Sequence, residues 1–310
     1  MRLVFMGTPH FAIPSLKTLL ENRYDVAAVV TTPDRPRGRG QQVAPSPVKA
    51  FALQHHLTLL QPENLSDPSI ISSLRFLNAD LFVVVAFRIL PKEVYTIPPK
   101  GSFNLHASLL PKYRGAAPIN WAIIRGETET GVTTFFLQDK VDTGSIILQA
   151  RVRIGPDETA GELHDKLAQV GAEIVLQTVR LIELDRVTVR PQDDSLATTA
   201  PKIFKEDCRI RWEQTSAQVH NLVRGLSPYP AAWTLHNGKL LKIYRTRLSE
   251  SGQLRSAAPG TIVAVSPQSL EVQTGSGVIS VVELQQEGRR RMGIEEFLRG
   301  YELRIEDQFT

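Results

Sequence analysis

The chain has 310 residues, of which 42% are hydrophobic and 22% are charged. At roughly 150 residues per domain this length favours two domains, and the composition excludes a mainly disordered chain. The net charge of +4 is small for this length, so a basic surface depends on where the charges lie and not on their sum.

A single cysteine, Cys208, excludes an intrachain disulfide and a cysteine metal cluster. Neither His–x–x–x–His nor another metal-ligand spacing is present, so we expect no metal. Met1–Phe5 has a strand pattern and lacks the charged and then apolar order of a signal peptide. The longest strongly apolar run, Leu81–Phe87, is far shorter than the ~20 residues that span a bilayer. We therefore expect a cytoplasmic protein without a membrane partner.

The first part of the chain alternates strand and helix patterns. Strands are predicted at Leu3–Met6, Val26–Val30, Leu81–Ala86, Ser102–Ala107 and Val132–Leu137, and helices at Phe11–Leu20 and, after a capping box at Thr159–Glu162, at Leu163–Leu181. This alternation predicts an α/β, Rossmann-like domain with an open, mostly parallel sheet covered on both faces. The first turn, at Gly7, lacks the glycine pattern of dinucleotide-binding enzymes and of NTPases, which disfavours both classes.

The pattern changes near residue 190. A polar stretch is followed by strand patterns, and the pair Asn237–Gly238 between two of them predicts a tight hairpin. A second hairpin is predicted around Gly275–Gly277. We predict a catalytic domain over residues 1–190, a linker over 191–206 and a small β-barrel domain over 207–310.

Basic residues gather in three places: a Pro/Gly loop, the first of these hairpins, and a run near the end of the chain. They include Arg35, Arg37, Arg39, Lys239, Lys242, Arg245, Arg247, Arg289, Arg290 and Arg291. Each cluster alone is compatible with an ordinary solvated face. Three clusters on loops and hairpins of one chain instead favour a polyanionic partner, because Lys and Arg side chains neutralise phosphates.

The segment from Asn104 to Pro118 carries the strongest chemical pattern. Asn104 and His106 are two residues apart on a predicted strand and so point to one face, at the strand end where open α/β sheets bind ligands. An amide beside an imidazole can bind an oxyanion and move a proton; the alternative is a buried core histidine next to a turn-forming asparagine. Asp142 in the loop Asp139–Gly144 can orient an imidazole, although an ordinary turn explains the same pattern.

The Asn104–x–His106 pair, the segment SLLPKYRGAAPIN and the Asp142–x–Gly144 loop resemble folate-dependent formyltransferases. The arginine loop TTPDRPRGRGQQVAPSPVK, the segment KIFKEDCRIRW and the ending GRRRMGIEEFLRG point, within that family, to the members that act on methionyl-tRNA. The resemblance covers essentially the whole chain.

The resemblance implies transfer of the formyl group of 10-formyltetrahydrofolate to the α-amino group of methionyl initiator tRNA. It implies Asn104, His106 and Asp142 as catalytic residues, and a folate-binding segment at Ser108, Leu109, Leu110 and Pro111. It also implies an OB-like C-terminal domain that binds tRNA, and a monomer. Contacts to tRNA are expected from Arg35, Arg37, Arg39, Lys239, Lys242 and Arg289. The loop that carries the first three matches the family's insertion near the acceptor end, and Arg39 is the best candidate for contact there.

Three other functions compete with this one. A formyltransferase for an amino sugar nucleotide would share the first domain but needs neither the arginine loop nor a basic barrel. An inactive enzyme fold that only binds RNA would bind tRNA without turnover, which the presence of Asn104, His106 and Asp142 disfavours. A folate-binding hydrolase would release formate without tRNA.

Overall fold

The computed structural model describes residues 1–37, 42–249 and 257–310. Its contacts divide the chain into two compact units. The first unit comprises Met1–Gly115, Thr130–Val152 and His164–Thr199, and the second comprises Ala116–Glu129, Arg153–Leu163 and Ala200–Thr310. The domain boundaries expected from the sequence stay predictions.

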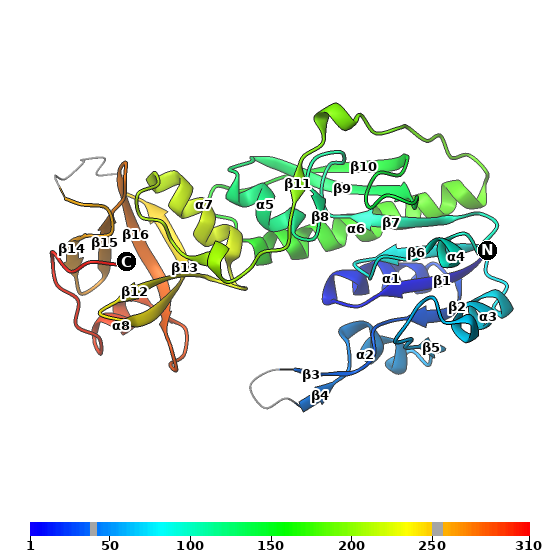
Figure 1. The fold of residues 1–310 in the computed structure, drawn as a ribbon, viewed down its shortest axis with the longest axis horizontal. Coiled ribbons are helices and arrows are strands. Elements are labelled where there is room, and N and C mark those ends of the chain that lie inside the picture. Colours follow the sequence, from blue (N-terminus) through cyan, green and yellow to red (C-terminus); the bar gives the residue numbers. More distant parts are fainter. Residues whose placement is uncertain (38–41, 250–256) are drawn as a thin grey trace. The chain divides into compact units, whose positions relative to one another are not determined.

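The first unit is built on a mixed seven-stranded sheet in the order β10-β9-β7-β6-β1-β2-β5 (Figure 1). These strands are β1 (Arg2–Gly7), β2 (Asp25–Val30), β5 (Leu59–Leu60), β6 (Leu81–Val85), β7 (Ser102–His106), β9 (Glu129–Phe136) and β10 (Ile146–Arg153). The pairs β1–β2, β1–β6, β2–β5 and β6–β7 are parallel, and β7–β9 is antiparallel. The predicted Rossmann-like, mostly parallel sheet is confirmed.

The helices of the first unit follow the strands in the expected alternation. They are the 3-10 turn η1 (His10–Ala12), α1 (Ile13–Glu21), α2 (Pro47–Gln54), α3 (Pro68–Phe76), α4 (Lys92–Tyr95) and the greater part of α6 (Ala160–Glu183). A short antiparallel pair, β3 (Arg35–Arg37) with β4 (Gln42–Ala44), stands in the arginine loop. The predicted capping box is confirmed, since the Thr159 amide donates to Glu162 Oε2 at 2.8 Å and the Glu162 amide to Thr159 Oγ1 at 3.3 Å.

The two faces of the sheet pack against different helices, because strand side chains alternate. Val4 and Val84 belong to a buried cluster with Leu74 of α3 and Val94 of α4. On the other face, α6 approaches Leu105 so closely that a Cβ on Gly171 would lie 2.7 Å from a Leu105 methyl carbon. Asn104 and His106 therefore point away from α6.

The second unit contains an antiparallel sheet in the order β12-β13-β16-β15-β14, with β17 paired to β16. The strands are β12 (Ala232–His236), β13 (Lys239–Leu248), β14 (Ile262–Ser266), β15 (Ser269–Gln273), β16 (Val278–Gln286) and β17 (Met292–Gly293). Both predicted hairpins are confirmed. Asn237 and Gly238 join β12 to β13 with φ values of 48° and 74°, which fit a two-residue hairpin turn.

Helices α5 (Pro118–Ile124), α7 (Ser216–Leu226) and α8 (Ile294–Leu298) complete the second unit. The short elements β8 (Arg114–Gly115), η2 (Asp194–Leu196), β11 (Thr199–Ala200) and η3 (Glu206–Cys208) lie in the connecting segments. Helices α5 and α7 meet at Gly225, where a Cβ would lie 2.6 Å from an Ile124 side-chain carbon.

The last residues of the chain connect the two ends of the antiparallel sheet. Leu235 in β12 and Thr310 exchange backbone hydrogen bonds of 2.9 and 3.0 Å. At the other end, Ile262 in β14 donates to the Asp307 carbonyl at 2.8 Å, and Phe309 donates to the Gly260 carbonyl at 2.9 Å. The C-terminal tail therefore bridges β12 and β14, so the sheet curves into the predicted OB-like barrel.

Candidate active site

The central feature of the site is the end of β7. Asn104 pairs with Val84 of β6 and Phe135 of β9, and His106 pairs with Thr133 of β9. The Asn104 side chain is half-buried and makes no hydrogen bond to any described residue. Its amide is therefore available to a ligand at the carboxyl end of the strand.

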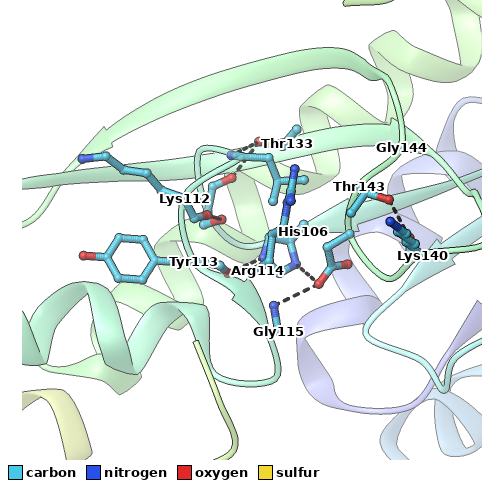
Figure 2. A network of polar contacts seen from close by, with 12 residues as sticks. His106, Lys112, Tyr113, Arg114, Gly115, Thr133, Lys140, Thr143 and Gly144 are labelled. Carbon is cyan, nitrogen blue, oxygen red and sulfur yellow. Dashed lines mark hydrogen bonds and ion pairs between the residues drawn. The ribbon is translucent and has the colours of Figure 1, made fainter. Parts of the chain in front are cut away.

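His106 is buried, with 6% of its surface exposed, and both of its ring nitrogens face oxygen atoms (Figure 2). Nε2 lies 2.8 Å from the Tyr113 carbonyl oxygen, and Nδ1 lies 3.8 Å from Asp142 Oδ2. A carbonyl oxygen only accepts hydrogen bonds, so Nε2 carries a proton in this contact. The ring thereby presents Nδ1 to the carboxylate.

Asp142 lies in the loop between β9 and β10, and its carboxylate accepts a 3.0 Å hydrogen bond from the Gly115 backbone amide (Figure 2). Its side chain is 10% exposed. With φ at 55°, it adopts the left-handed conformation that only aspartate, asparagine and glycine adopt readily. The structure thus brings together His106, at the end of β7, and Asp142, in the loop between β9 and β10.

The predicted folate segment follows β7, and the Thr133 side chain in β9 forms hydrogen bonds with its backbone. The Thr133 hydroxyl donates to the Ser108 carbonyl at 2.7 Å and accepts from the Leu110 amide at 3.1 Å. Ser108 and Leu110 are buried, and the Ser108 hydroxyl donates to the Lys112 carbonyl at 2.6 Å. Leu109 and Pro111 are half-buried and retain accessible surface. Ser108 and Leu110 therefore shape the loop, and Leu109 and Pro111 are the members that a ligand can reach.

A pocket of about 390 Å³ adjoins the Asp142 loop, at the size expected for a small-molecule site. It is lined by Lys92, Tyr95, Leu137, Gln138, Asp139, Lys140 and Thr143. The Tyr95 hydroxyl donates to Asp139 Oδ1 at 2.5 Å, and this hydrogen bond raises the pKa of Tyr95 to about 12. Lys92 Nζ lies 3.4 Å from the same carboxylate. Two lysines, the Asp139 carboxylate, the Gln138 amide and the hydroxyls of Tyr95 and Thr143 give the pocket a polar rim with a net positive charge.

The sequence alone did not indicate Tyr95 or the Tyr113 carbonyl as parts of this region, and it indicated Asp139 only as the first residue of the Asp142 loop. Neither Tyr95 nor Asp139 belongs to a recognisable spacing, and the contact between them joins residues 44 positions apart. The Tyr113 group is a backbone carbonyl, which no residue type reveals. Only the tertiary fold brings these groups to the site.

The basic residues expected to contact tRNA occupy two regions. Arg35 is exposed at the start of β3 and Arg37 ends that strand, whereas Arg39 lies outside the described residues. In the second unit, Lys242 pairs across β13 and β16 with Gln285, whose side chain donates to the Arg289 carbonyl at 2.5 Å. The backbone at Arg289 therefore lies beside the strand pair that carries Lys242, although the two residues are distant in sequence.

Other members of these basic clusters are neutralised by carboxylates. Arg245 pairs with Glu162 at 2.5 Å, and Arg291 pairs with Glu283 at 2.5 Å. Arg290 pairs with Glu296. Within the described part of the chain, Lys242 and Arg289 have no carboxylate partner, and Lys239 contacts the Tyr301 ring with its ammonium 5.7 Å from the ring centroid. The cations free to meet a polyanion are thus fewer than the sequence clusters suggest.

Among the described residues, no group of three or more His, Cys, Asp and Glu side chains could hold a metal ion. Among the same residues, no helix is both long and apolar enough to cross a membrane.

The fold and the site together define the class of protein: an α/β enzyme with an amide, an imidazole and a carboxylate at a strand end, followed by an antiparallel β unit. Residues 1–179 match the formyl transferase family, and residues 202–302 match the formyl transferase C-terminal domain. The chain belongs to the formyl transferase family.

Full-length relatives carry a more specific name. The chain is 48% identical to a methionyl-tRNA formyltransferase of Flavobacterium johnsoniae, over 97% of this chain and 96% of the relative. It is 47% identical to the protein of that name from Desulforamulus reducens, over 98% and 96% of the two chains.

Solved structures of more distant proteins share the fold. The sugar 3N-formyl transferase WlaRD matches with a TM-score of 0.69 at 20% identity, covering 94% of this chain and 99% of that one. HypX from Aquifex aeolicus, solved in complex with tetrahydrofolic acid, matches with a TM-score of 0.66 at 18% identity. The matched region covers 100% of this chain and 50% of HypX. At these identities the similarity shows the fold alone.

Proposed function

We propose that this chain transfers the formyl group of 10-formyltetrahydrofolate to the α-amino group of methionyl initiator tRNA, producing N-formylmethionyl-tRNA. The observation that carries this proposal is the near-complete, 48% identical match to a protein named methionyl-tRNA formyltransferase. The geometry of Asn104, His106 and Asp142 supports it, because formyl transfer from one nitrogen to another needs polar groups around a single carbonyl and no redox chemistry.

Asn104 has the role of oxyanion donor. Attack by an amine places negative charge on the carbonyl oxygen of the transferred group, and a preorganised amide N–H stabilises that charge. The free, half-buried amide at the end of β7 fits this requirement. A single donor of this kind contributes ~10²–10³ in rate.

His106 and Asp142 act as a pair. The amine must be neutral to attack and must then lose a proton, so the site needs groups that accept and release protons. In this proposal Nδ1 of the neutral His106 ring accepts the proton that the amine loses, and Asp142, which faces Nδ1, stabilises the imidazolium that forms. Acid–base participation of this kind contributes ~10²–10⁴ in rate.

The pocket beside the Asp142 loop is the proposed folate site. When bound there, the folate would supply an activated formyl carbonyl. Lys92 and Lys140, which line the pocket, offer cations to carboxylates, and Leu109 and Pro111, which lie outside the pocket lining, offer partly accessible apolar surface in the loop after β7. These residues fit the size and charge of the co-substrate.

The tRNA is proposed to contact the basic residues of both units. Arg35, Arg37 and Arg39 would meet the acceptor end, and Lys239, Lys242 and Arg289 would meet backbone phosphates. Arg35, Lys242 and Arg289 are the strongest candidates among the described residues, since no described carboxylate neutralises them.

The deciding experiment measures formyl transfer from 10-formyltetrahydrofolate with three acceptors: methionyl initiator tRNA, methionyl elongator tRNA and an amino sugar nucleotide. We expect rapid formylation of the initiator tRNA and weak formylation of the other two. Transfer to the sugar alone, or formate release without tRNA, would refute the proposal. The matched control is Asn104→Ala, which should lose transfer while still binding tRNA.

A further inference from the structure

The segment expected to be a linker contributes a side chain to the Asp142 loop. Gln192 Nε2 donates to the Asp142 carbonyl at 2.9 Å and to the Gly144 carbonyl at 2.8 Å. One side-chain amide thus binds both ends of the turn in which Asp142 adopts its left-handed conformation, with φ at 55°. A non-glycine residue in this region is uncommon, so surrounding contacts must hold it there.

Arg114 fixes the orientation of that amide. Its Nε and Nη2 atoms donate to Gln192 Oε1 at 3.1 and 2.7 Å. Because a guanidinium only donates hydrogen bonds, the oxygen of Gln192 must face Arg114 and the NH₂ group must face the Asp142 turn. Arg114 also pairs with Asp194 at 2.7 Å, on the solvent side, where the Asp194 side chain is 80% exposed.

The backbone around Gln192 is anchored on both sides of the site. Arg190 exchanges two hydrogen bonds of 2.8 and 2.9 Å with Ile146, at the start of β10. Thr198 accepts from the Tyr113 amide at 2.9 Å through its hydroxyl, and from the Arg114 amide at 2.9 Å through its carbonyl. Residues 190–198 therefore span from the strand after Asp142 to the loop after His106.

We propose that Gln192 is a positioning residue for the reaction: it holds the Asp142 turn so that the carboxylate faces His106 and the Gly115 amide, and Arg114 keeps its amide in the required orientation. This inference rests on the proposed function, since it assigns Gln192 a part in formyl transfer. The hydrogen bonds of the Gln192 side chain go to Asp142, Gly144 and Arg114, and none goes to His106 or to a residue that lines the pocket. Its effect on catalysis must therefore pass through Asp142.

The test is Gln192→Glu, which keeps the size of the side chain and its contact with Arg114 but cannot donate to the two carbonyls when ionised. Displacement of a catalytic group by about 1 Å costs up to ~10²-fold in rate. We expect kcat to fall about 10- to 100-fold, with KM for the folate and the tRNA changed less than about twofold. Asp194→Asn, which alters only the exposed side of Arg114, is the matched control and should retain wild-type kcat.

A double-mutant cycle separates this role from a general loss of structure. In the Asp142→Asn background, Gln192→Glu should cause no further loss of kcat, because its effect operates through Asp142. Independent, multiplicative losses, or wild-type kcat in Gln192→Glu, would overturn the proposal. If Gln192→Glu does not fold, Gln192→Ala, which introduces no charge, is put through the same cycle and must meet the same criteria.

A measurement without substrate keeps this inference separate from the proposed function. The Gly115 amide is bonded to Asp142 Oδ2, so its hydrogen exchange reports the position of the carboxylate. We expect faster exchange of the peptide containing Gly115 in Gln192→Glu than in the wild type or Asp194→Asn. Unchanged exchange contradicts the inference even if the wild type formylates tRNA. Faster exchange in Gln192→Glu, together with a wild type that does not formylate tRNA, would refute only the proposed function.

Discussion

His106 Nδ1 lies 3.8 Å from Asp142 Oδ2, a distance at which the pair interacts electrostatically but lacks a normal hydrogen bond. The other ring nitrogen is held by the Tyr113 carbonyl at 2.8 Å. A backbone group thus fixes the ring, and the carboxylate lies beyond hydrogen-bond distance of it. Catalytic contacts that are long in the absence of substrate often shorten in the reacting complex.

Removal of the imidazole should therefore affect turnover and not binding. We expect His106→Ala to lower kcat by about two or more orders of magnitude, with the affinity for tRNA close to that of the wild type. Steady-state kinetics and a tRNA-binding titration give both values. The control is His164→Ala, which removes a second histidine–aspartate pair, formed with Asp165 on the surface. Wild-type turnover in His106→Ala would remove His106 from the mechanism.

Asn104 should behave differently from His106 in one respect. Because its side chain makes no hydrogen bond within the described structure, Asn104→Ala leaves no buried partner unsatisfied and should change the free energy of unfolding little. We expect kcat to fall ~10²–10³-fold with an unchanged unfolding midpoint. A large loss of stability, or normal kcat, would show that the amide serves the fold and not the oxyanion.

The strands, and the placement of Asn104 and His106 on one strand face, could be predicted because both depend on local patterns. The run Leu81–Val85 is buried on both faces, as its continuous apolar character requires, and Asn237–Gly238 forms the hairpin turn that its two residues favour. Asn104 and His106 share a face because strand periodicity leaves no other arrangement.

The contacts that hold the Asp142 loop in place could not be predicted from local patterns. Gln192 lies in a polar segment without periodicity, and its contact with Asp142 joins residues 50 positions apart. The same limit applies to charge. Arg245 and Arg291 resemble free cations in the sequence, but Glu162 and Glu283 meet them through the tertiary fold.

The arginine run 289–291 offers a direct comparison of a free and a paired cation. Arg289→Gln should weaken tRNA binding and reduce the salt dependence of the binding constant by about one phosphate contact. Arg290→Gln should have a smaller effect on the slope, because Glu296 already neutralises that arginine. Binding titrations over a range of salt concentrations measure both slopes. Equal slopes for the two variants and the wild type would exclude Arg289 as a phosphate contact.

Glu162 provides a prediction on pH and stability. The backbone hydrogen bond from Thr159, with further contributions from Arg245 and the Thr159 hydroxyl, lowers the pKa of Glu162 from 4.5 to about 2. A carboxyl group whose pKa is lower in the folded state stabilises the fold above its unfolded pKa and loses this effect as the pH falls. Its contribution should thus be complete above about pH 5 and decline from pH 4.5 to 2.

We expect Glu162→Ala to cost about 1 kcal/mol of unfolding free energy at pH 7, as for a lost helix cap, and less at pH 3. Glu162→Gln retains the capping geometry and should cost less at pH 7. Urea unfolding at the two pH values measures these differences. A cost of Glu162→Ala that is equal at both pH values would contradict the assigned role of the ionised carboxylate.

Closure of the second sheet by the C-terminal tail depends on Phe309. Its side chain is 2% exposed and packs against Trp212 and His236, with ring centroids 5.8 Å apart in each pair. Phe309→Ala removes this anchor from the segment that bridges β12 and β14, and we expect it to lower the unfolding free energy by about 3–5 kcal/mol. The control residue is Ile305, which is 60% exposed on the same tail. Ile305→Ala should change the unfolding free energy by less than about 0.5 kcal/mol. Urea unfolding followed by tryptophan fluorescence measures both variants, and equal stabilities would show that the barrel holds its shape without the tail.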